Sequence, residues 1–221
     1  MLTWALLGLF ILFLLVAYIV VQGTRAALAW RKAAAEGDTK VIREIVEDCL
    51  EGWRSQKRPK PVPVEVWRGI QSLQLVDVEA DFVRVSATAE SEYKLADGQW
   101  IEMKNPLQEG IAITAGAADM LFYELPHYRP ERLQIDVYTT FRDDTGVTRR
   151  ECVLSTETTR EHARDVDWED WTPDQIVDAL GGRFELSASG RPLPIEVAPP
   201  PVREDDETDE AKDTTATEAR S

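Results

Sequence analysis

An uninterrupted apolar run near the amino terminus constrains this chain more than any other feature. Residues Trp4 to Val21 read WALLGLFILFLLVAYIVV, eighteen positions without a charged or strongly polar side chain. As a helix, the run is about 27 Å long, close to the roughly 30 Å hydrocarbon core of a bilayer. Tyr18 and Trp30 lie where aromatic rings favour the membrane interface. Residues 1–23 are therefore predicted to form a transmembrane anchor in the lipid bilayer.

The flanks of the run predict that the anchor is retained and how it is oriented. A cleaved signal peptide has a basic amino-terminal region and a shorter apolar stretch, and the small-residue triplet Ala27-Leu28-Ala29 lies well past the run. Arg25, Arg31 and Lys32 follow the run, and Lys and Arg resist translocation. We expect a single-pass protein of the cell membrane, with the amino terminus outside and the soluble domain in the cytoplasm.

Composition narrows the chemistry of the remaining chain. The net charge of −15 opposes nucleic-acid binding, which usually needs a basic face. The two cysteines, Cys49 and Cys152, lack the spacing of metal ligands and do not predict a disulfide framework. One disulfide between them is the alternative. His127 and His162 are the only histidines, and no glycine-rich phosphate loop occurs. We expect no metal, no cofactor and no nucleic acid.

A juxtamembrane helix is predicted over 24–37 and a second helix after the N-cap residue Asp38. The second helix carries one apolar stripe, which indicates packing on the domain's own sheet; an intermolecular coiled coil is the alternative, although the stripe is shorter than three heptads. If exposed, Val41, Ile45 and Trp53 would form a partner surface, and homo-oligomerisation is open. The stripe consists of Val41, Ile42, Ile45, Val46, Cys49, Leu50 and Trp53.

The basic, proline-rich stretch 54–63 follows this helix and predicts an extended linker. It is read as a solvated linker, with contact to anionic lipid headgroups as the alternative. Its cations and prolines are Arg54, Lys57, Arg58, Lys60, Pro59, Pro61 and Pro63.

Alternating apolar and polar residues over 83–95 predict one strand with one face in the core and the other in water. The segment 73–80 is predicted to pair with it, and Ala96-Asp97-Gly98 to turn the chain into a short strand over 99–103. A second hairpin is predicted from Leu133 to Leu154, with its turn at 143–146.

Two further helices begin with capping signals. Asn105-Pro106-Leu107-Gln108 and Thr172-Pro173-Asp174-Gln175 each place a cap residue, a proline and a glutamine in order. The first helix is predicted to reach Leu125 and to be buried, because it is apolar nearly all round.

These elements predict an α+β domain over 38–197, built of roughly two αββ units with an antiparallel or mixed sheet and helices on one face. The order is compatible with profilin-like or roadblock-like sandwiches and, less well, with a cone of the NTF2 or Tim44-like kind; no motif supports either comparison. Residues 198–221 are proline-rich and acidic and are predicted to be disordered.

Two motifs that resemble functional sites have simpler interpretations. Asp144-Thr145-Gly146 matches the triplet of aspartic proteases, but its charged flanks indicate a hairpin turn. The acidic stretch 165–170 lacks the glycine and glutamate of a calcium-binding loop. Trp168 and Trp171 are instead expected to anchor the last helix or to form a partner-docking site.

Asp119 is the only ionisable residue between Gly110 and Phe122. A buried carboxylate there would be paired or have a raised pKa, and exposure at a narrow solvent edge is the simpler alternative. We expect a non-enzymatic, membrane-tethered interaction or scaffold module, with no catalytic residue. The alternative is a small-molecule-binding or hydrolytic domain in which Trp100, Asp119, Tyr123 and His127 line a pocket.

Overall fold

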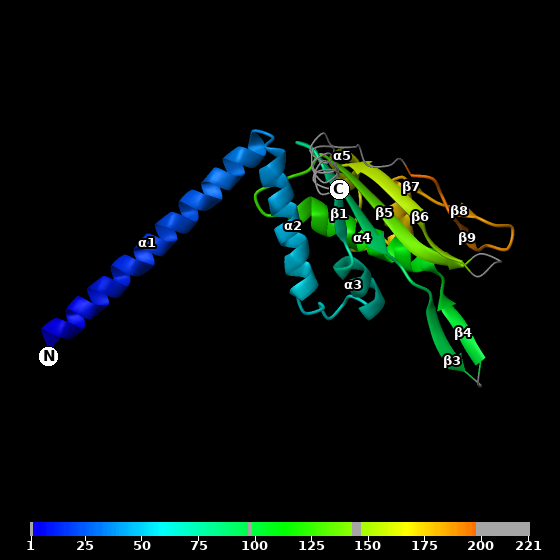
Figure 1. Ribbon diagram of the computed structural model, residues 1–221, viewed down its shortest axis with the longest axis horizontal. Helices are drawn as coiled ribbons and strands as arrows, with labels where there is room; N and C mark the ends of the chain where they lie inside the picture. Colours follow the sequence, from blue (N-terminus) through cyan, green and yellow to red (C-terminus); the bar gives the residue numbers. More distant parts are fainter. Residues whose placement is uncertain (1, 97–98, 143–146, 198–221) are drawn as a thin grey trace, which may run out of the picture.

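The computed structural model describes residues 2–96, 99–142 and 147–197 and has a long amino-terminal helix attached to an α+β domain (Figure 1). The main sheet has five strands in the order β1-β2-β5-β6-β7. In chain order the elements are α1 (Leu2–Ala35), α2 (Thr39–Ser55), α3 (Val64–Gln71), β1 (Gln74–Val78), β2 (Phe82–Thr88), β3 (Glu92–Ala96), β4 (Gln99–Lys104), α4 (Pro106–Tyr123), β5 (Arg132–Arg142), β6 (Thr148–Thr159), α5 (Arg160–Arg164), α6 (Pro173–Ala179), β7 (Gly182–Arg183), β8 (Glu185–Leu186) and β9 (Pro192–Leu193).

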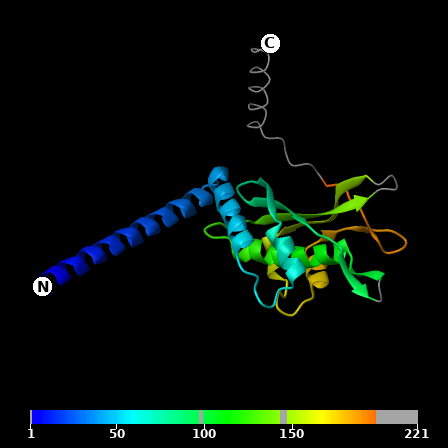
Figure 2. The ribbon, with the colours of Figure 1, turned by 60° about the horizontal axis from the view of Figure 1, so that its bottom comes forward.

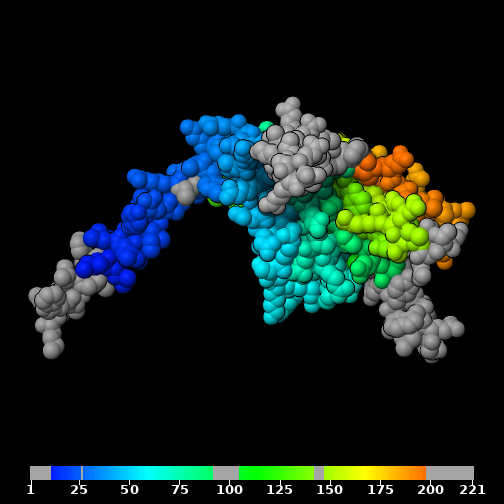
Figure 3. Space-filling view, in the orientation of Figure 1, coloured from blue at the N-terminus to red at the C-terminus, as the bar shows by residue number. Residues whose placement is uncertain are grey.

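Helix α1 is long and apolar enough to cross a membrane and stands clear of the domain (Figure 3). Among the described residues the candidate span is Ile11–Ala35, in which the most apolar stretch of 18 residues has a mean hydropathy of 1.9. The large apolar side chains from Ile11 to Val21 are 48–68 % exposed to solvent, so this helix is not buried in the core. Gly37, at φ +79°, ends the helix in the left-handed region that favours glycine.

Helix α2 begins at the predicted position and packs against the domain. The Asp38 carboxylate accepts hydrogen bonds from the backbone N–H groups of Lys40 and Val41. Five members of its apolar stripe are buried, and α2 contacts β1 and α3. The stripe therefore belongs to the domain core, as the first interpretation predicted, and nothing supports the coiled coil. The buried members are Ile42, Ile45, Val46, Leu50 and Trp53.

The sheet is mixed. Strands β1 and β2 pair antiparallel, β2 pairs parallel with β5, and β5 pairs antiparallel with β6 and through it with β7. Helices α3, α4 and α6 lie on one face of this sheet (Figure 2). The chain order is α2-α3-β1-β2 before and α4-β5-β6 after the hairpin β3-β4, which forms a separate two-stranded sheet.

The prediction of one continuous strand over 83–95 was wrong. Strand β2 ends at Thr88, and β3 begins at Glu92 in a different sheet. The predicted water-facing side of this strand was also wrong for β2, because Arg84 and Ser86 are only 5 % and 6 % exposed.

The buried polar side of β2 is satisfied by neighbours on β5 and β6. Arg84 Nε donates to Asp136 Oδ2 at 2.8 Å, and the two side chains are 6 % and 1 % exposed. Asp136 Oδ1 accepts hydrogen bonds from Ser155 Oγ at 2.7 Å and from Gln134 Nε2 at 3.0 Å. The alternating apolar and polar residues of β2 therefore belong to a strand that is buried on both faces. One face is apolar, and the other carries the charged network.

Helix α4 is the central helix of the domain and confirms the predicted capping signal. Asn105 Oδ1 accepts from the N–H of Gln108, and Gln108 Oε1 accepts from the N–H of Asn105. A Cβ added at Gly110 would lie 3.1 Å from Val137 Cγ1, so this glycine permits close packing of α4 on β5. The same capping box, between Thr172 and Gln175, begins α6.

The three predicted strand pairings are confirmed: β1 pairs with β2, β3 with β4, and β5 with β6. The predicted turn at 143–146, which includes the Asp-Thr-Gly triplet, lies outside the described residues, as do residues 97–98 and the predicted disordered tail 198–221.

Candidate binding groove

A half-open groove of about 590 Å³ lies on the helical side of the domain. Its walls are the linker between α2 and α3, one side of α3, the outer side of α4, and the segment that leads into α6. The lining is mainly apolar and includes three tryptophans and four prolines. Its residues are Gln56, Pro59, Pro61, Val62, Pro63, Val66, Trp67, Ile70, Ala112, Ala115, Gly116, Asp119, Met120, Glu124, Trp168, Trp171, Pro173 and Ile176.

Close contact between α3 and α4 forms the floor of the groove. A Cβ added at Gly69 would overlap the side chain of Ile113, and one at Gly116 would lie 3.2 Å from Ile70 Cδ1. Both glycines therefore let the two helices approach each other. Trp67, on α3, is only 4 % exposed, and its indole Nε1 has no hydrogen-bond partner within the described ranges.

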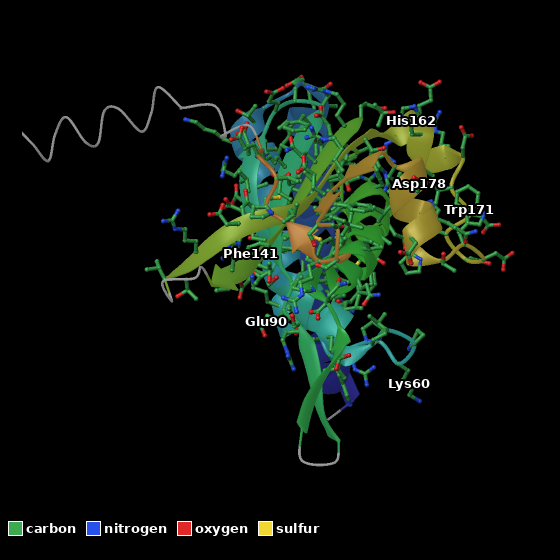
Figure 4. The ribbon with its side chains drawn as sticks, turned by 90° about the vertical axis from the view of Figure 1, so that its right-hand side faces the viewer. Lys60, Glu90, Phe141, His162, Trp171 and Asp178 are labelled. Atoms are coloured by element: carbon green, nitrogen blue, oxygen red, sulfur yellow. The ribbon has the colours of Figure 1, made fainter. Side chains whose placement is uncertain are left out.

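The proline-rich linker forms one wall and is held in place by side-chain hydrogen bonds. Gln71 Nε2, on α3, donates to the backbone oxygen of Arg54 at 2.9 Å, which ties α3 to the end of α2. The Arg58 guanidinium donates to the backbone oxygens of Lys60 and Val62. Most of the linker is exposed to solvent, as predicted, and only Pro59 and Val62 are half-buried; Lys60 lies at its outer edge (Figure 4).

The opposite wall contains the two tryptophans of the acidic segment. Trp168 Nε1 donates to the backbone oxygen of Ala163 at 3.1 Å, and its ring meets that of Tyr123 edge to face at 5.9 Å. Trp168 thus anchors the segment to the domain, as predicted. Trp171 is 38 % exposed and projects from the segment before α6 (Figure 4).

A carboxylate of the acidic segment caps its own backbone. Asp167 Oδ1 accepts hydrogen bonds from the N–H groups of Glu169 and Asp170 at 3.3 and 3.1 Å. An aspartate at position 167 is therefore explained by the turn that its side chain stabilises. No group of three or more His, Cys, Asp or Glu side chains suited to a metal ion occurs among the residues whose positions are described.

Two carboxylates lie in the apolar lining. Burial raises the pKa of Asp119, on α4, above its ordinary value. Burial also raises the pKa of Glu124, the C-cap residue of α4, and repulsion from Asp119 adds to this rise. Neither carboxylate has a hydrogen-bond or ion-pair partner in the described part of the chain. The lining therefore contains two acidic side chains that have no cationic partner among the described residues.

The raised pKa of Asp119 predicts that this side chain destabilises the domain at neutral pH. A carboxyl group whose pKa is higher in the folded state binds its proton more readily there, so stability falls as the pH rises through the raised value. Asp119→Asn should raise the melting temperature at pH 7 by about 1 to 3 °C. The gain should shrink as the pH is lowered, because the raised pKa of Asp119 lets this group take up its proton at a higher pH in the folded state than in the unfolded state.

Thermal unfolding between pH 4 and pH 8, followed by tryptophan fluorescence, measures this effect. Asp178→Asn removes a charge from the exposed side of α6 and is the matched control (Figure 4). A lower melting temperature of the Asp119→Asn variant at pH 7 would contradict the interpretation, because it would reveal a stabilising contact of the carboxylate.

The structure separates the four residues predicted to share a pocket. Asp119 lines the groove, and Tyr123 is next to it, with its hydroxyl donating to the backbone oxygen of Ala163. His127 instead lies at the junction with α1, where its Nδ1 accepts from Arg31 Nε at 3.0 Å. Trp100 belongs to β4, in the inserted hairpin, and its side chain lies outside what the structure describes.

The residues predicted as a partner surface are also separated. Ile45 and Trp53 are 3 % and 5 % exposed and lie in the core, whereas Val41 is half-buried. Trp168 and Trp171 line the groove. Only the two indoles therefore belong to a surface feature with a defined shape.

His127 is a backbone outlier. Its φ is +64°, a value that few non-glycine residues adopt. Together with Pro126, Ile45, Asp48 and residues of α1, it lines a second hollow of about 300 Å³. This junction positions α1 and brings no partner group to Asp119.

Both cysteines are free thiols. Burial raises the pKa of each to about 11, so neither is a reactive thiolate at neutral pH.

Most of the lining was missed by sequence reasoning. Trp67, Met120 and the linker prolines come from segments that are distant in the chain, and α3 was not predicted. The proline spacing 59-61-63 was visible, but it indicates an extended conformation and does not reveal which surface the linker covers.

Comparison with known proteins gives no relative: no family model, no curated protein and no solved structure matches this chain.

Proposed function

We propose that this protein is a membrane-tethered, non-enzymatic binding module that engages a partner protein through the groove between α3, α4 and α6. Helix α1 is the tether, and the domain works at the cytoplasmic face of the cell membrane. The observation that carries the proposal is the groove itself, which combines apolar walls with a partly exposed tryptophan, Trp171. Tryptophan in a desolvated pocket is typical of residues that dominate binding energy.

The exposed apolar surface of α1 supports the tether. Soluble monomers rarely expose large contiguous apolar patches, and this run is exposed along its described length. Its transfer into a bilayer would bury those side chains. Arg25, Arg31 and Lys32 on the domain side favour the cytoplasmic orientation.

Small-molecule binding in the same groove is the second candidate, supported by the half-buried Asp119 carboxylate. A hydrolytic version has less support, because His127 lines a different hollow and does not face Asp119.

Four forms of the full-length chain test the proposal in one experiment. They are the wild type, Leu12→Lys/Leu15→Lys, Trp171→Ala and Phe184→Ala. Phe184 is 41 % exposed, compared with 38 % for Trp171, and lies outside the groove, so it is a matched control. Each form is expressed at an equal level and its membranes are divided into two portions. One portion is washed with alkaline carbonate to measure membrane retention, and the other is solubilised gently without this wash to quantify co-purifying proteins.

The two lysines should release the chain from washed membranes, because each costs about 2.5 to 3.5 kcal/mol at the centre of a span. Trp171→Ala should leave the chain in membranes. It should lower the affinity for the partner about thirtyfold, as expected for the loss of a hot-spot side chain that contributes about 2 kcal/mol. Phe184→Ala should change neither result. Retention of the lysine variant in washed membranes, or the same co-purifying set with Trp171→Ala, would refute the proposal.

A further inference from the structure

The two ionisable side chains that line the groove are both acidic, while the cations Lys57, Arg58 and Lys60 belong to the linker that forms one wall. Asp119 and Glu124 are the two ionisable residues of the lining, which contains no Lys, Arg or His. Burial raises the pKa of both carboxyl groups; Asp119 is half-buried, whereas Glu124 is exposed to solvent. A cation placed beside them would relieve both the desolvation and their mutual repulsion. The groove is therefore complementary to an apolar body that carries positive charge.

The shape of the groove favours a polypeptide over a small ligand. Small-molecule pockets bury about 70–90 % of the ligand surface. This groove is half-open, and Trp171 remains 38 % exposed beside it.

The acidic tail of the chain is a poor occupant. Residues 203–221 contain eight acidic and three basic side chains, a net charge of 3 − 8 = −5, which Asp119 and Glu124 would repel. The last described residues also lie across the sheet from α3 and α6 (Figure 2). A segment of another protein is therefore the better match.

We infer that the groove binds a short segment of a partner protein in which one Arg or Lys is flanked by apolar side chains. The cationic group lies beside Asp119 and Glu124, and the apolar side chains pack against Trp171 and Met120. This inference rests on the proposed function and specifies the chemistry of the partner. A hydrogen bond from a cation to a carboxylate is stronger than one between neutral groups. The positive charge of the Arg or Lys should therefore raise the affinity of the segment for the groove about tenfold.

A random octapeptide library displayed on phage tests the inference. The full chain is embedded in nanodiscs of zwitterionic phosphatidylcholine, and binders to empty nanodiscs are removed first. The selected peptides are sequenced for the wild type, Asp119→Asn/Glu124→Gln and Asp178→Asn. Asp178 is an exposed carboxylate of α6 outside the lining and is the matched control for charge loss.

Peptides with Arg or Lys between apolar residues should be enriched about tenfold over those with Gln at the same position. The double variant should reduce this ratio to about 1 while still selecting apolar residues, and Asp178→Asn should preserve it. Enrichment without a basic preference, or the same preference in the double variant, overturns the inference alone. No enrichment over empty nanodiscs overturns the proposed function as well.

Two further arms identify other occupants. If 1 mM n-octylamine displaces the selected peptides as efficiently as the free peptide does, the site accepts a small amphipathic cation, and the polypeptide assignment is wrong. If deletion of residues 198–221 increases peptide capture, the chain's own tail occupies the groove, and the assignment to another protein is wrong. Unchanged capture in both arms supports the inference.

Discussion

Removal of the Asp136 carboxylate is expected to lower the free energy of unfolding by about 3 to 5 kcal/mol, the largest effect of any single substitution in the charged network. In the Asp136→Ala variant the guanidinium of Arg84 would stay buried without its ionic partner. Both side chains are at most 6 % exposed, so water cannot replace the lost hydrogen bonds without opening the sheet. Ser155 and Gln134 would lose their acceptor at the same time.

Urea unfolding of the full chain in detergent micelles, followed by tryptophan fluorescence, measures this effect. The double variant Arg84→Met/Asp136→Leu should be more stable than Asp136→Ala, because it removes both charges together. Gln134→Ala removes one of the neutral donors to the Asp136 carboxylate and should cost about 1 kcal/mol. A loss below 1 kcal/mol for Asp136→Ala would mean that the ion pair is solvated, in contradiction to the buried network.

This network also explains why one sequence prediction failed. The period-2 pattern of Val83, Arg84, Val85 and Ser86 is the same for a half-exposed strand and for one that buries a charged face. The partners that allow Arg84 to be buried lie on β5 and β6, about fifty and seventy residues later in the chain. Local alternation alone could not reveal them.

Local signals predicted helix starts well. The caps at Asp38, Asn105 and Thr172 all lie where the sequence placed them, because each cap is completed within three residues. Helix α3 was missed because its eight residues follow a proline-rich stretch that indicates an extended chain, and its amphipathic face is visible only against α4. The break at Ala89–Ser91, which moves the next strand to another sheet, likewise has no strong turn signal.

The groove was predictable only in part. Asp119 was identified because it is the lone ionisable residue of an apolar helix, and Trp168 and Trp171 because two indoles stand in an acidic segment. Their convergence was not predictable, since it depends on how α6 and the linker pack against α4. Tyr123 and His127 are close to Asp119 in sequence, but the end of α4 directs them to different surroundings.

The tether and the groove have a joint consequence for binding. A domain held to a membrane by one helix meets partners in the same membrane at a raised effective concentration. A moderate affinity at the groove is then sufficient for occupancy. The proposal therefore predicts that the partner contacts the groove in intact membranes, where the tether acts.

Site-specific photo-crosslinking in intact membranes tests the central claim most directly. Benzoylphenylalanine is introduced at position 171 in the full chain, with position 184 as the control of similar exposure outside the groove. After irradiation, position 171 should give one or a few discrete adducts of higher mass, and Asp119→Asn/Glu124→Gln should reduce their yield about tenfold. Position 184 should give none of these adducts. No adduct at position 171, or the same adducts at both positions, would contradict a membrane-tethered module that binds its partner through this groove.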